Sequence, residues 1–124
     1  MSTLLVLDDD VGIRENLAEY LEDEGYECKT TELGSEGLEL CRQCTAIRLV
    51  IVDLRLPDMG GVEFIEKVYR LNGGIGCLIH TGSVEFELPE SLLLKGVSEE
   101  DLFYKPIIDM PAFINRIEWH LKDI

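Results

Sequence analysis

Basic residues and long apolar runs are scarce in this sequence. It contains 11 Lys plus Arg against 25 Asp plus Glu, and its formal net charge is −14. Most of such a surface repels a phosphate backbone, so we expect no direct binding to nucleic acid. No apolar run approaches the ~18 residues of a membrane span, and the N-terminus lacks the basic segment of a secretory signal. We therefore expect a cytoplasmic protein that does not bind membranes.

Linkers, internal repeats and low-complexity stretches are also absent. The chain has 124 residues, of which 46% are hydrophobic and 29% charged, the balance of a globular protein. This length suffices for one domain with its own core. We expect residues 1–124 to form a single domain.

The four cysteines do not indicate a redox or zinc site. Cys41 and Cys44 have the spacing C-x-x-C, but they fall near the end of an expected helix, where the dipole does not stabilise a thiolate. Zinc would need two further ligands, and neither Cys28 nor Cys77 is an obvious candidate. We interpret all four as structural or incidental thiols of a reducing compartment.

Strand-like and helix-like patterns alternate five times along the chain. Apolar runs predict strands over 3–7, 26–31, 48–52, 76–81 and 101–105. Helical patterns fall at 10–24, 34–44, 60–72, 89–96 and 109–122. The third and fourth strands are continuously apolar, as in a parallel sheet covered on both faces. Strict alternation with short connections predicts right-handed crossovers and a doubly wound α/β sandwich.

Five polar residues fall at the expected strand ends, namely Asp8, Asp9, Asp53, Thr81 and Lys105. Parallel strands present their carboxyl ends at one edge of the sheet, where doubly wound proteins bind their ligands. Carboxylates crowded into one small volume repel one another unless a cation binds between them. The pattern therefore indicates a divalent metal site and, with it, phosphate chemistry.

These residue types suit the transfer of a phosphoryl group. Asp8, Asp9 and Asp53 offer the oxygen ligands that Mg²⁺ prefers, and Asp53 would also be the nucleophile that becomes an aspartyl phosphate. Thr81 offers a hydroxyl and Lys105 a positive charge to the phosphoryl oxygens. Positioning and charge neutralisation are most of what this transfer requires from a protein.

Taken in order, these residues resemble a response-regulator receiver domain of two-component signalling, similar to the stand-alone chemotaxis regulator. The resemblance covers essentially all of the chain. Asp8 and Asp9 match the acidic pair of the family, and Asp53 matches its phosphoacceptor. The remaining matches are Thr81 with the switch hydroxyl, Lys105-Pro106 with the Lys-Pro pair, and Pro57 and Gly61 with the loop after the phosphoacceptor.

The resemblance implies a flavodoxin-like (βα)5 sandwich with a five-stranded parallel sheet of order 2-1-3-4-5. It also implies Mg²⁺ as the cofactor, with the backbone carbonyl of Arg55 as a metal ligand beside Asp8, Asp9 and Asp53. The implied phosphodonor is a histidine kinase or a histidine phosphotransfer protein.

The chain departs from the family pattern in three places. Leu102 stands where the family usually has Tyr or Phe, three residues before the lysine. The stretch 83–101 is longer than usual and contains Pro89, so we expect its helix to be short or shifted. Arg55 and Ser83 flank the place where water would attack the phosphoryl group, and we expect Arg55 to alter the rate of hydrolysis.

Other polar residues have simpler interpretations. We expect Asp10 to cap the first helix, since Asp is a favoured N-cap. We expect His80 to pack in the core and His120 to lie on the surface of the last helix. Trp119 points away from the apolar stripe of that helix. It is expected either to contact a downstream protein or a second copy, or to lie flat against a neighbouring element.

Three functions compete for this site. The first is a receiver that is phosphorylated on Asp53, catalysing its own phosphorylation and dephosphorylation without being a conventional enzyme. The second is a small haloacid-dehalogenase-like phosphotransferase with Asp8 as the nucleophile, a hypothesis that leaves Asp53 and Pro57 without a purpose. The third is an unphosphorylated protein-interaction module that keeps the fold alone. A flavin site is disfavoured, because carboxylates after the first strand would repel its phosphate.

Overall fold

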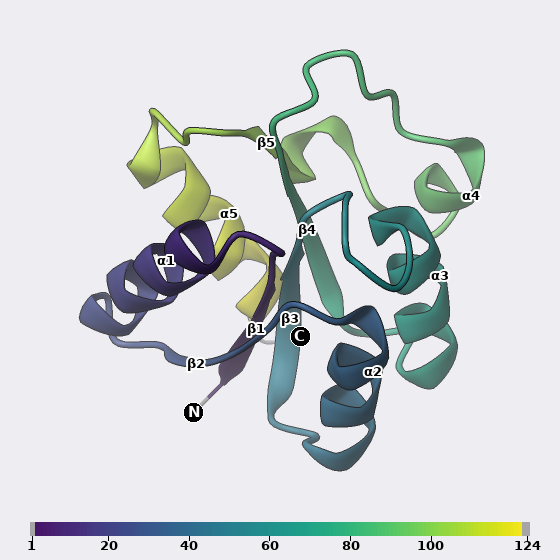
Figure 1. Cartoon of the computed structure of the whole chain (residues 1–124), viewed down its shortest axis with the longest axis horizontal. Helices are drawn as coiled ribbons and strands as arrows, with labels where there is room; N and C mark the ends of the chain where they lie inside the picture. Colours follow the sequence, from purple (N-terminus) through teal and green to yellow (C-terminus); the bar gives the residue numbers. More distant parts are fainter. Residues whose placement is uncertain (1, 123–124) are drawn as a thin grey trace.

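The protein is a three-layer sandwich with one parallel sheet between two layers of helices (Figure 1). The structure is a computed structural model that describes residues 2–122. Its elements are β1 (Thr3–Leu7), α1 (Val11–Asp23), β2 (Glu27–Thr31), α2 (Gly34–Gln43), β3 (Ile47–Val52), α3 (Gly61–Leu71), β4 (Gly76–Thr81), α4 (Glu90–Leu93), the 3₁₀ turn η1 (Glu99–Asp101), β5 (Leu102–Tyr104) and α5 (Met110–Leu121). None of the helices in residues 2–122 is both long and apolar enough to cross a membrane.

The sheet has the strand order β2-β1-β3-β4-β5, and every pair is parallel. The predicted doubly wound fold and its strand order are therefore confirmed. Helices α1 and α5 cover one face of the sheet, and α2, α3 and α4 lie on the other side (Figure 1). The strand order reverses between β1 and β3, so the crevice for a ligand is expected beyond the carboxyl ends of these two strands.

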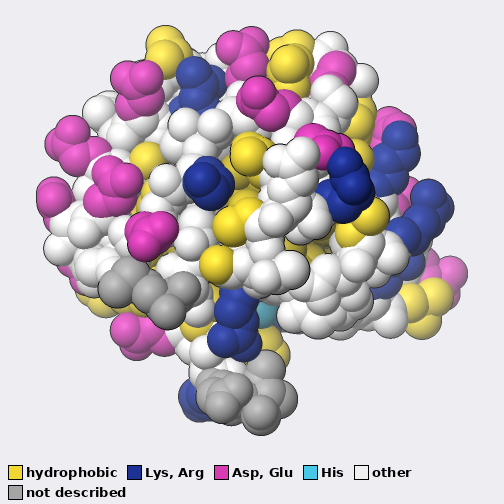
Figure 2. All heavy atoms as spheres, turned by 90° about the horizontal axis from the view of Figure 1, so that it is seen from below, with side chains coloured by type: hydrophobic (Ala, Val, Ile, Leu, Met, Phe, Trp, Pro, Cys, Tyr) yellow, Lys and Arg dark blue, Asp and Glu magenta, His cyan; other side chains and the backbone are white. Residues whose placement is uncertain are grey.

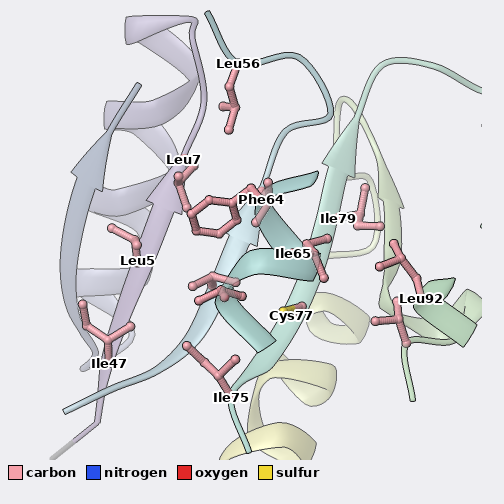
Figure 3. Close-up of a cluster of buried hydrophobic side chains, with 14 residues drawn as sticks. Leu5, Leu7, Ile47, Leu56, Phe64, Ile65, Ile75, Cys77, Ile79 and Leu92 are labelled. Carbon is pink, nitrogen blue, oxygen red and sulfur yellow. The ribbon is translucent and has the colours of Figure 1, made fainter. Parts of the chain in front are cut away.

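The core is divided by the sheet, and alternate residues of each central strand serve its two sides. Leu5 and Leu7 of β1 face α2 and α3, where Phe64 and Ile65 of α3 are completely buried (Figure 3). Leu4 and Val6 face α1 and α5. Because both faces are covered, most residues of β1, β3 and β4 are apolar, as the runs Leu4–Leu7, Leu49–Val52 and Cys77–Ile79 show.

The region after β4 differs most from the expected boundaries. Helix α4 has only four residues and begins after Pro89, which confirms the expected short helix. The strand expected over 101–105 is wrong at both ends, since β5 is confined to Leu102–Tyr104. Asp101 instead closes η1, where its carboxylate accepts a hydrogen bond from the Ser98 N–H at 2.9 Å. This capping turns the chain before the strand can begin.

The charged side chains are unevenly distributed over the surface. Seen from below, acidic side chains gather on the side of α1, and a group of Lys and Arg side chains lies on the side of α2 and α3 (Figure 2). On this face, therefore, the acidic and the basic side chains gather on opposite sides.

Candidate functional site

The first and third strands bring three carboxylates together. Leu7 of β1 is in register with Val52 of β3, and the Asp53 N–H donates to the Leu7 carbonyl at 2.9 Å. The residues that follow these two strands are therefore neighbours. Asp8, Asp9 and Asp53 each offer a carboxylate oxygen, and these oxygens lie within 4.8 Å of one another. We call these three residues the acidic cluster.

The fourth and fifth strands add a hydroxyl and an ammonium group to the acidic cluster. The Lys105 N–H donates to the Thr81 carbonyl at 2.8 Å, which aligns the ends of β4 and β5. Lys105 Nζ lies 2.8 Å from Asp8 Oδ2 and 3.3 Å from Asp53 Oδ2. The Thr81 hydroxyl accepts a hydrogen bond from the Ser83 N–H at 3.0 Å. All five residues singled out at the strand ends thus lie at one edge of the sheet.

A hollow of about 380 Å³ opens above the acidic cluster. It is lined by Asp9, Asp10, Ile13, Asp53, Arg55, Thr81, Gly82, Ser83 and Lys105. Asp8 does not line the hollow: it is 1% exposed, and its Oδ1 accepts a hydrogen bond from the Asp10 N–H at 2.9 Å. Asp53 therefore lines the hollow, while Asp8 is buried behind it.

The electrostatics of the site show an excess of negative charge. Burial raises the pKa of Asp53, and neighbouring Asp8 adds to this effect, which Lys105 only partly opposes. Burial disfavours the Lys105 ammonium, but its contacts with Asp8 and Asp53 outweigh burial and raise its pKa. One lysine cannot neutralise three carboxylates. The donor set is all oxygen and carries the charge that a hard divalent cation requires.

The loop after β3 is held against two helices. A side chain at Gly61 is excluded, because its Cβ would lie 2.5 Å from the carbonyl oxygen of Asp53. The Asp58 carboxylate accepts hydrogen bonds from the N–H groups of Gly34 and Ser35, at 2.8 and 2.9 Å, at the start of α2. These bonds lower the pKa of Asp58. Sequence reasoning missed this anchor, since nothing local to Asp58 indicates that its partner is α2.

Arg55 lies at the mouth of the hollow with an exposed side chain. Its main chain forms an antiparallel bridge with Gly60, which fixes the loop on either side of Pro57. The role of the Arg55 carbonyl as a metal ligand stays a prediction.

The remaining polar residues divide into confirmed and incorrect expectations. Asp10 caps α1 by accepting the Ile13 N–H at 3.1 Å, as expected. His80 is buried on β4, also as expected. The expectation that His120 lies on the surface is wrong: its side chain is 12% exposed, and its Nε2 lies 2.6 Å from Oδ1 of the buried Asp101. Trp119 points outward and is 54% exposed.

The cysteines agree with their interpretation as structural thiols. All four are unpaired. Burial, assisted by Cys44, raises the pKa of Cys41 to about 11, and burial raises that of Cys28 to about 12. Such thiols are protonated at neutral pH and are poor nucleophiles.

A doubly wound sheet with an acidic cluster and a lysine at its switch point defines the receiver class of signalling domains. The profile of the response regulator receiver domain family matches residues 4–118. The chain belongs to this family, and it is a receiver domain of two-component response regulators.

Curated relatives of the chain are response regulators. It is 34% identical over 97 residues to a response regulator receiver protein of Anaeromyxobacter sp. strain Fw109-5, covering 78% of this chain and 40% of that protein. It is 33% identical over 114 residues to the transcriptional regulatory protein GlrR of Escherichia coli K12, covering 86% of this chain and 25% of that protein. The matched chain thus spans less than half the length of these two relatives.

Solved structures show the same fold. A CheY-like receiver domain from Methanospirillum hungatei superposes with a TM-score of 0.81 at 29% identity, covering 98% of this chain and 95% of that one. The non-phosphorylated receiver domain of HemR from Leptospira biflexa gives a TM-score of 0.80 at 28% identity, covering 100% and 97%. The predicted flavodoxin-like sandwich is therefore the fold of this family.

Proposed function

We propose that Asp53 accepts a phosphoryl group in a Mg²⁺-dependent reaction, and that its phosphorylation shifts the conformation of the domain to signal to a partner. The observation that carries this proposal is the convergence of Asp8, Asp9 and Asp53 within 4.8 Å beneath an open hollow, with Lys105 as a cationic partner. Charge of this density at a ligand-binding edge is costly unless it serves a function.

The acidic cluster fits Mg²⁺ by number, type and spacing of its oxygen ligands. Asp8, Asp9, Asp53 and the backbone carbonyl of Arg55 would hold the ion. When bound, it would neutralise negative charge on the phosphoryl oxygens and on the carboxylates that surround them.

The protein groups have distinct roles in this proposal. A carboxylate oxygen of Asp53 forms a bond to phosphorus while the bond from phosphorus to a nitrogen of the donor histidine breaks, so the phosphoryl group moves without a net change of oxidation state. Lys105 places its ammonium beside Asp53, where it can pair with a phosphoryl oxygen. Thr81 accepts a hydrogen bond from Ser83, which leaves its own O–H free to donate to the same group.

Receiver domains act in signalling rather than as conventional enzymes, and the proposed donor is a histidine kinase or a histidine phosphotransfer protein. The downstream partner is a protein, and we place its contact on β5 and α5, where Trp119 is exposed. A second copy of the chain is the alternative occupant of that face. We also propose that residues 1–124 act as one domain and that it works in the cytoplasm, where the four unpaired thiols would remain reduced.

The competing phosphotransferase would use Asp8 as its nucleophile. Both oxygens of Asp8 are engaged, Oδ1 by the Asp10 N–H and Oδ2 by Lys105, and the residue is buried. Asp53 lines the hollow and is the more accessible of the two carboxylates. This difference favours Asp53 as the acceptor.

Acetyl phosphate with Mg²⁺, followed by intact-mass and peptide mass spectrometry, tests the proposal. We expect one phosphoryl group on the wild-type chain, mapped to Asp53, and none on Asp53→Asn. Asp58→Asn is the matched control, because Asp58 lies in the same loop but outside the acidic cluster. Modification of Asp8 would indicate the phosphotransferase instead. A wild-type chain that is never modified would indicate an interaction module.

We also propose that the side chain of Arg55 alters the rate at which the phosphorylated form is hydrolysed. Its exposed position at the mouth of the hollow supports contact with the phosphoryl group or with nearby acids, and hence an effect on hydrolysis. An Arg55→Ala variant whose phosphorylated form decays at the wild-type rate would contradict this role.

A further inference from the structure

A second hollow is lined by residues of α1 and of the connection from β5 to α5. Helices α1 and α5 lie on the same side of the sheet (Figure 1). The hollow is a groove of about 540 Å³ between α1 and the connection from β5 to α5. Its walls are almost entirely apolar and are formed by Ile13, Leu17, Tyr20, Pro106, Ile107 and Met110. The volume falls within the roughly 300–1,000 Å³ of pockets that bind small molecules.

His80 supplies a polar group at the inner end of the groove. The residue is 6% exposed, yet within residues 2–122 its imidazole makes no hydrogen bond. Buried polar side chains are normally hydrogen-bonded. No wholly buried side-chain nitrogen or oxygen in the described part of the chain lacks a partner, so the ring nitrogens of His80 are not sealed in the core. They open onto the groove.

The imidazole of His80 is uncharged at neutral pH. Burial lowers its pKa to about 4, and the nearby Lys105 ammonium acts in the same direction, while Asp8 opposes them. A neutral imidazole offers one N–H donor and one nitrogen acceptor. The other polar groups that line the groove are Asn16 of α1 and Lys105.

The charges around the groove select against ionic ligands. The Lys105 ammonium is already paired with Asp8 and Asp53, so it has no free counter-charge to offer an anion. The acidic cluster beyond Lys105 would repel an anion, and the ammonium itself would repel a cation. A ligand that is apolar over most of its surface, and that carries one neutral hydrogen-bonding group, matches both the walls and the polar end.

We propose that this groove binds a small, uncharged aromatic molecule with a single hydroxyl group, whose ring packs against the apolar walls and whose hydroxyl hydrogen-bonds His80. The proposal goes beyond the phosphoryl chemistry of the acidic cluster and does not depend on it. A ligand in the groove would also touch Lys105, and so adjoin the site of phosphorylation without occupying it.

The test uses 2-naphthol and naphthalene as probes in NMR titrations of the methyl signals of Ile13, Ile107 and Met110. Naphthalene has the same ring system without the hydroxyl group. We expect saturable shifts with both probes and a preference of roughly threefold to tenfold for 2-naphthol, the range of one net hydrogen bond. This preference should disappear in His80→Leu. Leu17→Trp places a larger side chain in the groove and should weaken the binding of both probes by roughly tenfold or more.

The other histidine provides the matched control. His120 lies at the far end of α5 and does not line the groove, so His120→Gln should leave the preference unchanged. Should His80→Leu not fold, the comparison of the two probes on the wild type and on Leu17→Trp still decides. Absence of saturable shifts, or an unchanged preference in His80→Leu, would overturn the proposal. The proposal would also be overturned if neither probe shifted the methyl signals but a phosphotransfer protein did. That result would show that the groove is a protein-docking face.

Discussion

The charges of carboxylates at opposite edges of the sheet are balanced differently. At the carboxyl edge, the acidic cluster holds three carboxylates, and the ammonium of Lys105 pairs with two of them, Asp8 and Asp53. At the amino edge, Asp101 precedes β5 and is 0% exposed. Its carboxylate lies 2.7 Å from Arg116 Nε and 2.6 Å from His120 Nε2, and it accepts the Ser98 N–H at 2.9 Å. We call these four residues the Asp101 network.

The pKa values of Asp53 and Asp101 shift in opposite directions. Burial raises the pKa of Asp53, and the single lysine does not overcome it. Burial alone would raise the pKa of Asp101 as well, but the hydrogen bonds from His120, Arg116 and Ser98 outweigh burial and lower it. The comparison teaches that burial by itself does not mark a functional acid. The charge of Asp101 is balanced by partners that join it to α5, whereas the acidic cluster keeps an excess of negative charge, which the proposed Mg²⁺ would neutralise.

The Asp101 network should give the largest change in stability. Asp101→Ala removes the acceptor shared by Arg116 and His120 and leaves these groups without their partner. We expect a loss of about 3–5 kcal/mol in the free energy of unfolding, the usual cost of breaking a buried ion pair. Urea denaturation followed by circular dichroism measures it. Glu100→Ala is the control, because Glu100 is adjacent but its side chain is 79% exposed. Equal losses in the two variants would contradict the assigned role of the network.

Asp53→Asn should act in the opposite direction and stabilise the fold. The substitution removes one of the crowded charges while keeping a side chain of similar shape. Since the pKa of Asp53 is raised on folding, its charged form is disfavoured in the native state. We expect the melting temperature at neutral pH to rise by about 2–5 °C, which corresponds to roughly 1 kcal/mol for a chain of this size.

The advantage of Asp53→Asn depends on pH. It is complete above the native pKa of Asp53, where the wild-type carboxylate is charged. It declines as the pH falls through that value and vanishes below the unfolded pKa of about 3.9. Melting curves of both proteins across this range, at low salt and without divalent cations, test the sign. An advantage that grows toward low pH would show that the charge of Asp53 is not the cause.

Mg²⁺ should stabilise the wild-type chain through the acidic cluster alone. A ligand that binds only the native state at ten times its dissociation constant adds about 1.4 kcal/mol to the free energy of unfolding. Asp53→Asn should lose most of this gain, because it removes one charged ligand. Asp101→Asn should keep the full gain in stability, since the charge of Asp101 is already paired within the Asp101 network and does not hold the ion. Thermal shifts measured against Mg²⁺ concentration distinguish these cases, and equal gains in both variants would place the ion elsewhere.

The same comparison explains what the sequence could predict. Asp8, Asp53, Thr81 and Lys105 each end an apolar strand, and a parallel sheet gathers such ends at one edge whatever the details of packing. Sequence reasoning could therefore identify the candidate site, and alternation could identify the fold. The short α4 could be expected from Pro89. The exact extent of β5 could not, because it depends on the turn that Asp101 closes with Ser98.

The Asp101 network was missed because its members are brought together only by the docking of α5. Asp101 was assigned to a strand, and His120 was expected on the surface. One signal was available: His120 follows Ile117 by three residues, and Ile117 belongs to the apolar stripe, so a helix places both on one side. The structure adds a tight fit there, since a Cβ on Gly76 would lie 2.8 Å from Nδ1 of His120. The glycine at the start of β4 makes room for the imidazole.

Trp119 should show how far the Asp101 network extends toward the surface. The guanidinium carbon of Arg116 lies 3.9 Å from the centroid of the Trp119 ring, whose residue is 54% exposed. A cation–π contact at such a site contributes about 0.5–1 kcal/mol, so we expect this loss in Trp119→Leu and a smaller one in Trp119→Phe, which keeps an aromatic face. A loss as large as that of Asp101→Ala would mean that the ring is part of the buried network rather than its rim.

A small loss of stability, accompanied by a change in Trp119 fluorescence on phosphorylation or on dilution, would instead assign the exposed ring to a contact with a partner or with a second copy. Fluorescence that changes in neither case would leave the stacking on Arg116 as the whole role of the side chain.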